Sequence, residues 1–129
     1  MFLLKTEVFA MSLEKLPHDH GDNGINLLES MPSETAIENV SNIMRQLADP
    51  SRLRIFWLLC HKEECVTNIA ALTQMSSPAV SHHLRLLKSC GLITSKRSGK
   101  EMYYRSADTE MVALLHRNIE KIADINCPD

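Results

Sequence analysis

Apolar residues recur every three or four positions in two long stretches near the ends of the chain, a pattern typical of amphipathic helices. The first stretch covers about residues 34–48 and follows Ser33, a good helix cap, and the last covers about residues 109–124. The apolar stripe of the first helix comprises Ile37, Val40, Met44 and Leu47. The stripe of the last helix comprises Val112, Leu115, Ile119 and Ile122. A domain this small cannot bury both stripes by itself, so we expect these helices to meet a second copy of the chain.

A second helix is predicted from Pro50 to about residue 60, because Asp49 can cap it and proline suits its first turn. We expect its apolar face to comprise Leu53, Phe56, Trp57 and Cys60. A polar break at residues 61–64 separates it from the next helix, about residues 66–73.

A turn at residues 74–76 leads to a further helix that we expect to be capped by Ser77, to have Pro78 at its first position and to end near Ser89. Its inward face comprises Val80, Leu84 and Leu87. Two strand-like runs follow, residues 92–97 and 101–105, joined by a turn in which Gly99 can take a positive φ.

The order of helix, short turn, polar-faced helix and hairpin predicts a mainly α fold with a small β-hairpin, the winged helix-turn-helix. We expect residues 1–32, which glycine and proline interrupt, to form a flexible arm, and residues 33–126 to form one DNA-binding and dimerisation domain. The chain carries no motif of an enzyme and no apolar run that could span a membrane, and its sparse cysteines are typical of a reduced, cytoplasmic protein.

The positive charge of the chain is concentrated in the segment that contains the second helix of the helix-turn-helix and the wing. The whole chain has a net charge of −2, whereas residues 76–105 hold six basic residues and one acidic residue, a net of +5. The second helix of such a unit enters a DNA major groove, and the wing reaches the backbone beside it. The predicted DNA-binding residues are Ser77, Ser81, His82, His83, Arg85 and Lys88 on the helix and Lys96, Arg97 and Lys100 on the wing. A winged-helix module that contacts protein is the alternative, but the polar and basic helix surface favours DNA.

Four segments resemble the ArsR/SmtB family of winged-helix repressors. They are residues 47–55, which begin Leu-Ala-Asp-Pro-Ser-Arg, residues 76–88, which contain Ser-Ser-Pro-Ala-Val-Ser-His-His, and the wing segments 91–93 and 99–104. The resemblance implies a homodimer formed through the first and last helices. It also implies binding to a palindromic double-stranded operator and release by an inducer, such as a zinc or cadmium ion.

The resemblance suggests two metal sites. His18 and His20, with Asp19, resemble the Cys-His-x-His arm of some relatives, and Cys65 lies in a segment that resembles their Glu-x-Cys-x-Cys run, with Thr67 in place of the second cysteine. In the second site, Asp108 and Glu110 at the start of the last helix would meet the end of that helix from the other copy of the chain. Asp124 is available there, but Lys121 occupies a ligand position and cannot bind a cation.

Two further alternatives follow from the residues themselves. His116 and Glu120 stand four residues apart on one helical face, a spacing that suits a metal or a simple hydrogen-bonded pair. The second alternative is a thiol sensor that uses two of the four cysteines. The four are Cys60, Cys65, Cys90 and Cys127. A repressor without a metal site is also compatible with the sequence.

Overall fold

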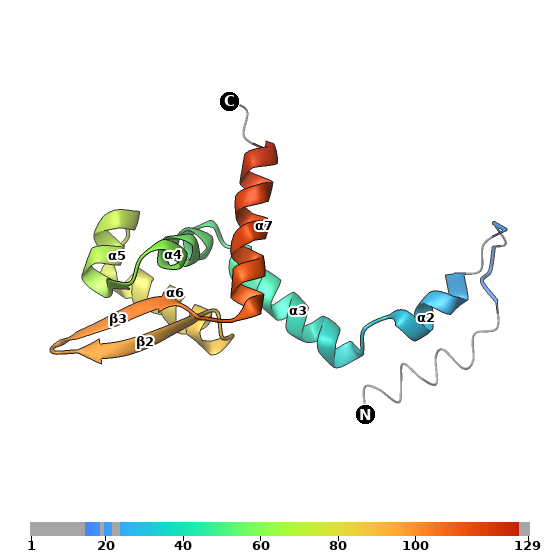
Figure 1. Ribbon diagram of the computed structural model, residues 1–129, viewed down its shortest axis with the longest axis horizontal. Helices are drawn as coiled ribbons and strands as arrows, with labels where there is room; N and C mark the ends of the chain where they lie inside the picture. Colours follow the sequence, from blue (N-terminus) through green and yellow to red (C-terminus); the bar gives the residue numbers. More distant parts are fainter. Residues whose placement is uncertain (1–14, 19, 22–23, 127–129) are drawn as a thin grey trace. The chain divides into compact units, whose positions relative to one another are not determined.

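The computed structural model describes residues 15–18, 20–21 and 24–126 of the 129-residue chain, so Asp19 and Cys127 lie outside the described residues. The chain divides into two units, Met1–Ile43 and Met44–Asp129. The first unit contains the 3₁₀ turn η1 (Gly24–Asn26), the short helix α2 (Leu27–Ser30) and most of α3 (Glu34–Leu47) (Figure 1). The Ser33 hydroxyl accepts a hydrogen bond from the backbone N–H of Ala36 at 3.1 Å, as predicted for a cap. The predicted boundary between arm and domain at residue 32 stays a prediction.

The second unit begins with α4 (Pro50–His61), and Asp49 caps it as predicted. Its buried face comprises Ile55, Phe56 and Leu59. The predicted apolar face was therefore wrong in part, since Trp57 is 41% exposed. The reason is that every residue from Leu53 to Cys60 except Arg54 is apolar, so the sequence pattern does not select one face.

Helix α5 (Val66–Thr73) and helix α6 (Ser77–Ser89) form the helix-turn-helix. The turn between them places Gln74 in the left-handed region at φ 56°. The cap of α6 is Ser76 rather than the predicted Ser77, because the Ser76 hydroxyl accepts the N–H of Ala79 at 3.3 Å. Two adjacent serines offer the same cap chemistry, and the sequence alone did not distinguish them.

Strands β2 (Ile93–Ser98) and β3 (Glu101–Ser106) form the antiparallel wing, which Figure 1 shows projecting from helices α4 to α6. Gly99 occupies the turn with φ 64°, as predicted. A third strand, β1 (Glu64–Cys65), pairs with β3 on the side opposite β2. The prediction treated this segment only as a polar break, because two residues are too few to show a strand pattern.

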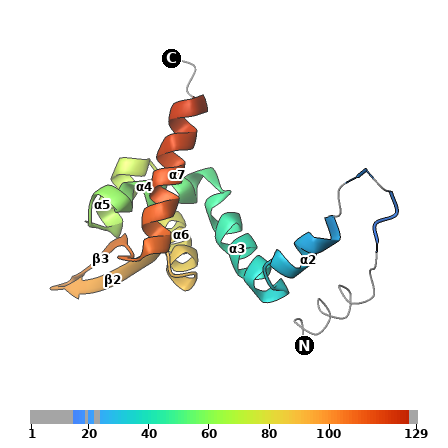
Figure 2. The ribbon, with the colours of Figure 1, turned by 45° about the vertical axis from the view of Figure 1, so that its right-hand side comes forward.

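The core of the second unit lies where α4, α5 and α6 meet the base of the wing. Its largest fully buried side chains are Phe56, Ile55, Leu59, Ile69, Leu84, Leu87, Leu92, Ile93 and Val80. The last helix, α7 (Glu110–Asn126), begins with the N–H of Val112 hydrogen bonded to the Thr109 hydroxyl, and Val112 itself is buried. Figures 1 and 2 both show the C-terminal part of α7 projecting beyond α4. In the part of the chain that the structure describes, no helix has the length and apolar character needed to cross a membrane.

Candidate functional site

Helix α6 has one buried face and one polar exposed face. Val80, Leu84 and Leu87 are at most 1% exposed and fix the helix against α4 and α5, as predicted. Among the DNA-binding residues predicted on this helix, the exposed ones are Ser77, Ser81, His82, Arg85 and Lys88. A helix anchored in this way presents hydroxyl, imidazole and guanidinium groups outward, which are the donors that contact base edges and phosphates.

His83 differs from its neighbours on α6 because it is only half-exposed and lies against α4. Its Nδ1 is 3.4 Å from an Arg52 guanidinium nitrogen, and the Arg52 Nε donates to the backbone carbonyl of Gln46 at 2.8 Å. Burial lowers the pKa of His83, the Asp49 carboxylate opposes this, and Arg52 lowers the pKa further. A largely neutral His83 therefore helps join α6 to α4.

The wing carries exposed Lys96, Arg97 and Lys100, close to its tip. Lys96 Nζ lies 3.4 Å from the Glu63 carboxylate, and Lys88 Nζ of α6 donates to the Ser95 hydroxyl of β2 at 2.6 Å. The first contact connects the wing to the segment between α4 and β1, and the second connects it to α6 of the helix-turn-helix.

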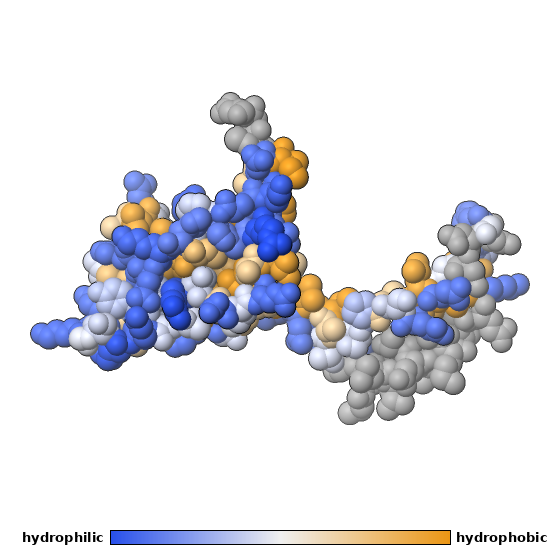
Figure 3. Space-filling view, viewed as in Figure 1, coloured by the Kyte–Doolittle hydropathy of each residue, from blue (hydrophilic) through white to orange (hydrophobic). Residues whose placement is uncertain are grey.

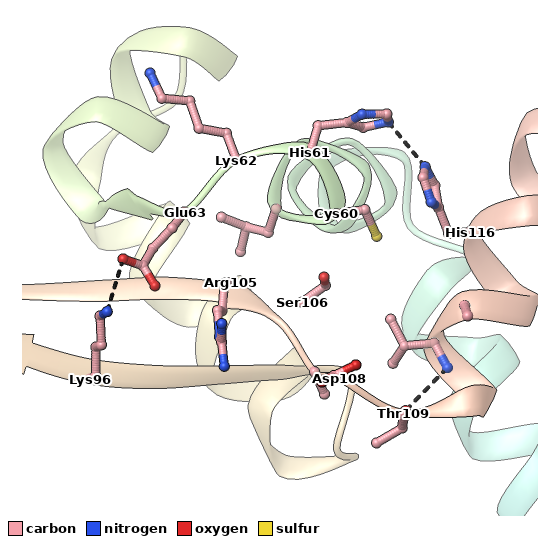
Figure 4. A pocket seen from close by; sticks show the side chains of 14 residues that line it. Cys60, His61, Lys62, Glu63, Lys96, Arg105, Ser106, Asp108, Thr109 and His116 are labelled. Atoms are coloured by element: carbon pink, nitrogen blue, oxygen red, sulfur yellow. Dashed lines mark hydrogen bonds and ion pairs between the residues drawn. The ribbon is translucent and has the colours of Figure 1, made fainter.

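The end of α4 and the middle of α7 bring His61, His116 and Glu120 together. The two histidine Nε2 atoms are 3.0 Å apart (Figure 4), and Glu120 Oε1 lies 2.7 Å from His116 Nε2 and 3.3 Å from His61 Nε2. The exposed fractions of the His61, Glu120 and His116 side chains are 44%, 48% and 27%. Among the described residues, this is the group of histidine, cysteine and carboxylate side chains with ligand atoms close enough to hold one ion. The ring of Trp57 lies against His61, with ring centroids 4.2 Å apart.

A pocket beside this cluster lies between the end of α4, the wing and the start of α7 (Figure 4). Cys60 points its thiol into the pocket. Burial raises the pKa of the Cys60 thiol to about 11, with a hydrogen bond from Ser106 opposing the rise and the Glu120 carboxylate adding to it. The thiol is therefore protonated at neutral pH.

The residues predicted for the first metal site belong to both units of the chain. His18 and His20 are exposed in the first unit, with ring centroids 6.1 Å apart, whereas Cys65 is 7% exposed in the second unit. Each unit is described by itself, so that site stays a prediction.

The second predicted site is spread along α7. Asp108 and Glu110 are exposed at its start, and Asp124 is exposed near its end. Fourteen residues of helix separate Glu110 from Asp124, about 21 Å along the axis, so one chain cannot bring both to one ion.

The sequence pattern identified His116 and Glu120 as a pair but missed His61. His61 is 55 residues from His116 in the chain, and only the fold brings the end of α4 against α7. A histidine at the predicted end of a helix was the one available signal, and helix ends commonly carry basic residues for other reasons.

Comparisons with known proteins agree on the central part of the chain. Residues 49–95 match the family described as "Bacterial regulatory protein, arsR family". A transcriptional repressor SmtB homolog from Synechocystis is 40% identical over 77 residues, which are 60% of this chain and 58% of that protein. The cadmium resistance transcriptional regulatory protein CadC from Listeria innocua is 30% identical over 99 residues, 76% of this chain and 83% of that protein.

The fold is also similar to solved structures. One is the homodimeric winged helix-turn-helix DNA-binding domain of a possible ArsR-family transcriptional regulator from Mycobacterium bovis. It aligns with a TM-score of 0.65 and 35% identity, over 72% of this chain and 85% of that one.

Proposed function

Because the chain belongs to the ArsR family of bacterial regulatory proteins, we propose that it is a transcriptional repressor that binds double-stranded operator DNA as a homodimer. The observation that carries this proposal is the division of α6 into a face buried by Val80, Leu84 and Leu87 and a face of exposed polar and basic side chains. Membership of a family of regulatory proteins agrees with the predicted absence of enzyme activity. A repressor of this kind works in the cytoplasm, beside its DNA.

The exposed face of α6 would enter the major groove, which is wide enough for one helix. Arg85 and His82 would contact base edges or nearby phosphates from this face. Arg97 and Lys100, near the tip of the wing, would contact the adjacent backbone and position the protein without reading sequence. The concentration of positive charge in residues 76–105 would attract DNA to this surface even though the whole chain is slightly acidic.

The dimer would be formed by the apolar faces of α3 and α7. Each helix exposes large apolar side chains within its own unit, and Figure 3 shows apolar groups along the projecting part of α7. The exposed ones are Ile37, Val40 and Met44 on α3 and Leu114, Ile122 and Ile125 on α7. The related domain from M. bovis is homodimeric, which supports the same assembly here. A two-fold dimer would address half-sites about one helical turn of DNA apart.

We also propose that a divalent metal ion releases the repressor from DNA. The support is the similarity to the Listeria protein, a cadmium resistance regulator, and the candidate ligands in this chain. The thiol alternative has less support, because burial raises the pKa values of Cys60 and Cys90 and makes both poor nucleophiles at neutral pH. The interaction-module alternative has less support because α6 exposes basic rather than apolar or acidic residues.

The test is selection from a library of random DNA duplexes by the full-length protein, followed by fluorescence anisotropy with the selected sequence. We expect the selected duplexes to share an inverted repeat and to bind more tightly than random DNA, with two chains per duplex. Arg85→Ala should weaken binding, whereas Arg54→Ala, which removes an exposed arginine from α4, should not. Equal affinity for selected and random duplexes would contradict the proposal.

A further inference from the structure

We propose that His61, His116 and Glu120 form a binding site for a borderline divalent transition-metal ion such as Zn²⁺, held between α4 and α7 of a single chain. The site differs from the two sites that the family resemblance suggested, which involve the arm with Cys65 or the two ends of α7. It adds His61 to the His116–Glu120 pair whose spacing the sequence already showed. It needs no second copy of the chain, because all three ligands belong to the second unit.

The spacing of the three ligand atoms fits a tetrahedral ion. With metal–ligand bonds of about 2.0–2.1 Å, two ligands of a tetrahedral zinc are about 3.3 Å apart. The three observed separations are 2.7, 3.0 and 3.3 Å. Side-chain shifts of a few tenths of an ångström would therefore admit the ion, and the partial exposure of the ligands leaves a direction open for a water molecule as the fourth ligand.

The arrangement is also one that a metal suits better than hydrogen bonding alone. His61 Nε2, His116 Nε2 and Glu120 Oε1 converge on one point. A neutral imidazole has one N–H. If both Nε2 atoms carry it and donate to Glu120 Oε1, the two nitrogens are left 3.0 Å apart with no hydrogen bond between them. An ion there would accept a lone pair from each imidazole and one from the carboxylate, which satisfies all three groups at once.

The donor set determines which metals are expected. Two imidazole nitrogens and one carboxylate oxygen suit zinc, cobalt and nickel, whereas cadmium and arsenite prefer thiolate sulfur. Cys60 is adjacent to His61 in the chain, but its sulfur is not among the grouped ligand atoms. We therefore expect zinc to bind this site more tightly than cadmium.

Because the site joins α4 to α7, metal binding there would alter DNA binding. This inference rests on the function proposed above. Helix α4 packs against the reading helix α6, whereas α7 has only sparse contacts with the other described elements. An ion that joins His61 of α4 to His116 and Glu120 of α7 would fix the angle between these two helices. It would thereby fix α7, a proposed dimerisation helix, relative to the DNA-binding helix α6. Metal and operator would then alter each other's affinity by the same factor.

Metal binding is tested first without DNA, by titrating the full-length protein with Co²⁺ under reducing conditions and then displacing it with Zn²⁺. We expect a tetrahedral cobalt spectrum from this site without a sulfur-to-metal charge-transfer band. Trp57 is the one tryptophan of the chain, and its ring lies tilted against that of His61 with centroids 4.2 Å apart, so its fluorescence should change during the same titration.

Variants assign the signal to its ligands. His61→Gln, His116→Gln and Glu120→Gln should each weaken zinc binding at least about tenfold, since loss of even an outer partner of a ligand has an effect of that size. The double variant His18→Ala/His20→Ala removes two exposed histidines from the first unit as a matched control, and it should leave zinc binding at the cluster unchanged. The proposal fails if the three cluster variants bind metal as the wild type does, or if the cobalt signal carries a thiolate band that Cys65→Ser removes.

The coupling is measured separately, as operator affinity with and without zinc. If zinc binds through the cluster but the protein has no preferred DNA sequence, the proposed function is wrong and the site remains. If DNA binding is specific but the cluster variants respond to zinc as the wild type does, the proposed regulatory role of the site is wrong and the repressor remains.

Discussion

Replacement of Asp49 would measure how much one helix cap stabilises the second unit. The Asp49 carboxylate accepts the backbone N–H of Arg52 at 2.9 Å, and this hydrogen bond is the main reason that the pKa of Asp49 is lowered, burial opposing it and the Arg52 charge assisting it. Loss of such a cap costs about 1 kcal/mol of unfolding free energy, within a range of roughly 0.5–2. For a chain of this length we expect Asp49→Ala to lower Tm by about 3–4 °C.

Asp49→Asn separates the hydrogen bond from the charge. An asparagine side chain caps about as well as aspartate, so at pH 7 this variant should retain most of the stability that Asp49→Ala loses. Because the folded pKa of Asp49 lies below its unfolded value, the charge contributes stability at neutral pH that is lost as the pH falls below about 4. The difference between wild type and Asp49→Asn should therefore shrink toward acid.

Urea denaturation followed by circular dichroism, at neutral pH and at about pH 3, measures both effects. Equal destabilisation by Asp49→Asn and Asp49→Ala at neutral pH would refute the capping argument. A wild-type advantage over Asp49→Asn that persists unchanged into acid would refute the electrostatic one.

Three further outcomes are expected. Leu84→Ala, at a side chain that is 1% exposed, should cost about 2–5 kcal/mol in urea denaturation, whereas Leu72→Ala, at one that is 58% exposed, should cost far less. Burial lowers the pKa of His83 in the folded state, so folding opposes its protonation and the protein loses stability as the pH falls below about 6.5. His83→Gln should reduce this loss, which Tm values at pH 7.5 and pH 5.5 measure. Arg97→Gln should reduce the slope of log affinity against log salt for the operator by about one, and an unchanged slope would remove Arg97 from the phosphate contacts.

Local sequence signals predicted the features that depend on a few neighbouring residues. The caps at Ser33 and Asp49, the positive φ of Gly99 and the buried face of α6 all follow from the chemistry of short segments. The buried face of α4 was not predictable in the same way. An apolar run offers several faces, and only the packing of α5, α6 and the wing selects one of them.

In the candidate site, too, the features set by one helix were predictable and those set by contacts between distant segments were not. The exposed residues of α6 were predicted because one helix determines which side chains share a face. His61 was missed because its role depends on contact with residues 55 positions away, and no spacing rule connects the end of one helix to the middle of another. Strand β1 was missed for a related reason, since its two residues become a strand only by pairing with β3.

The sparse packing of α7 explains why a small change at the cluster would have a large effect at the end of this helix. Val112 is buried and anchors the first turn, and His116 and Glu120 lie one and two turns further along. Ile125, which is 76% exposed, lies thirteen residues beyond Val112, about 20 Å along the axis. A tilt of α7 by about 10° at Val112 would therefore move Ile125 by roughly 3.5 Å, close to the van der Waals contact distance between two carbon atoms. An ion that fixes the angle near its pivot would determine whether the far end of α7 meets a second copy in the geometry that DNA requires.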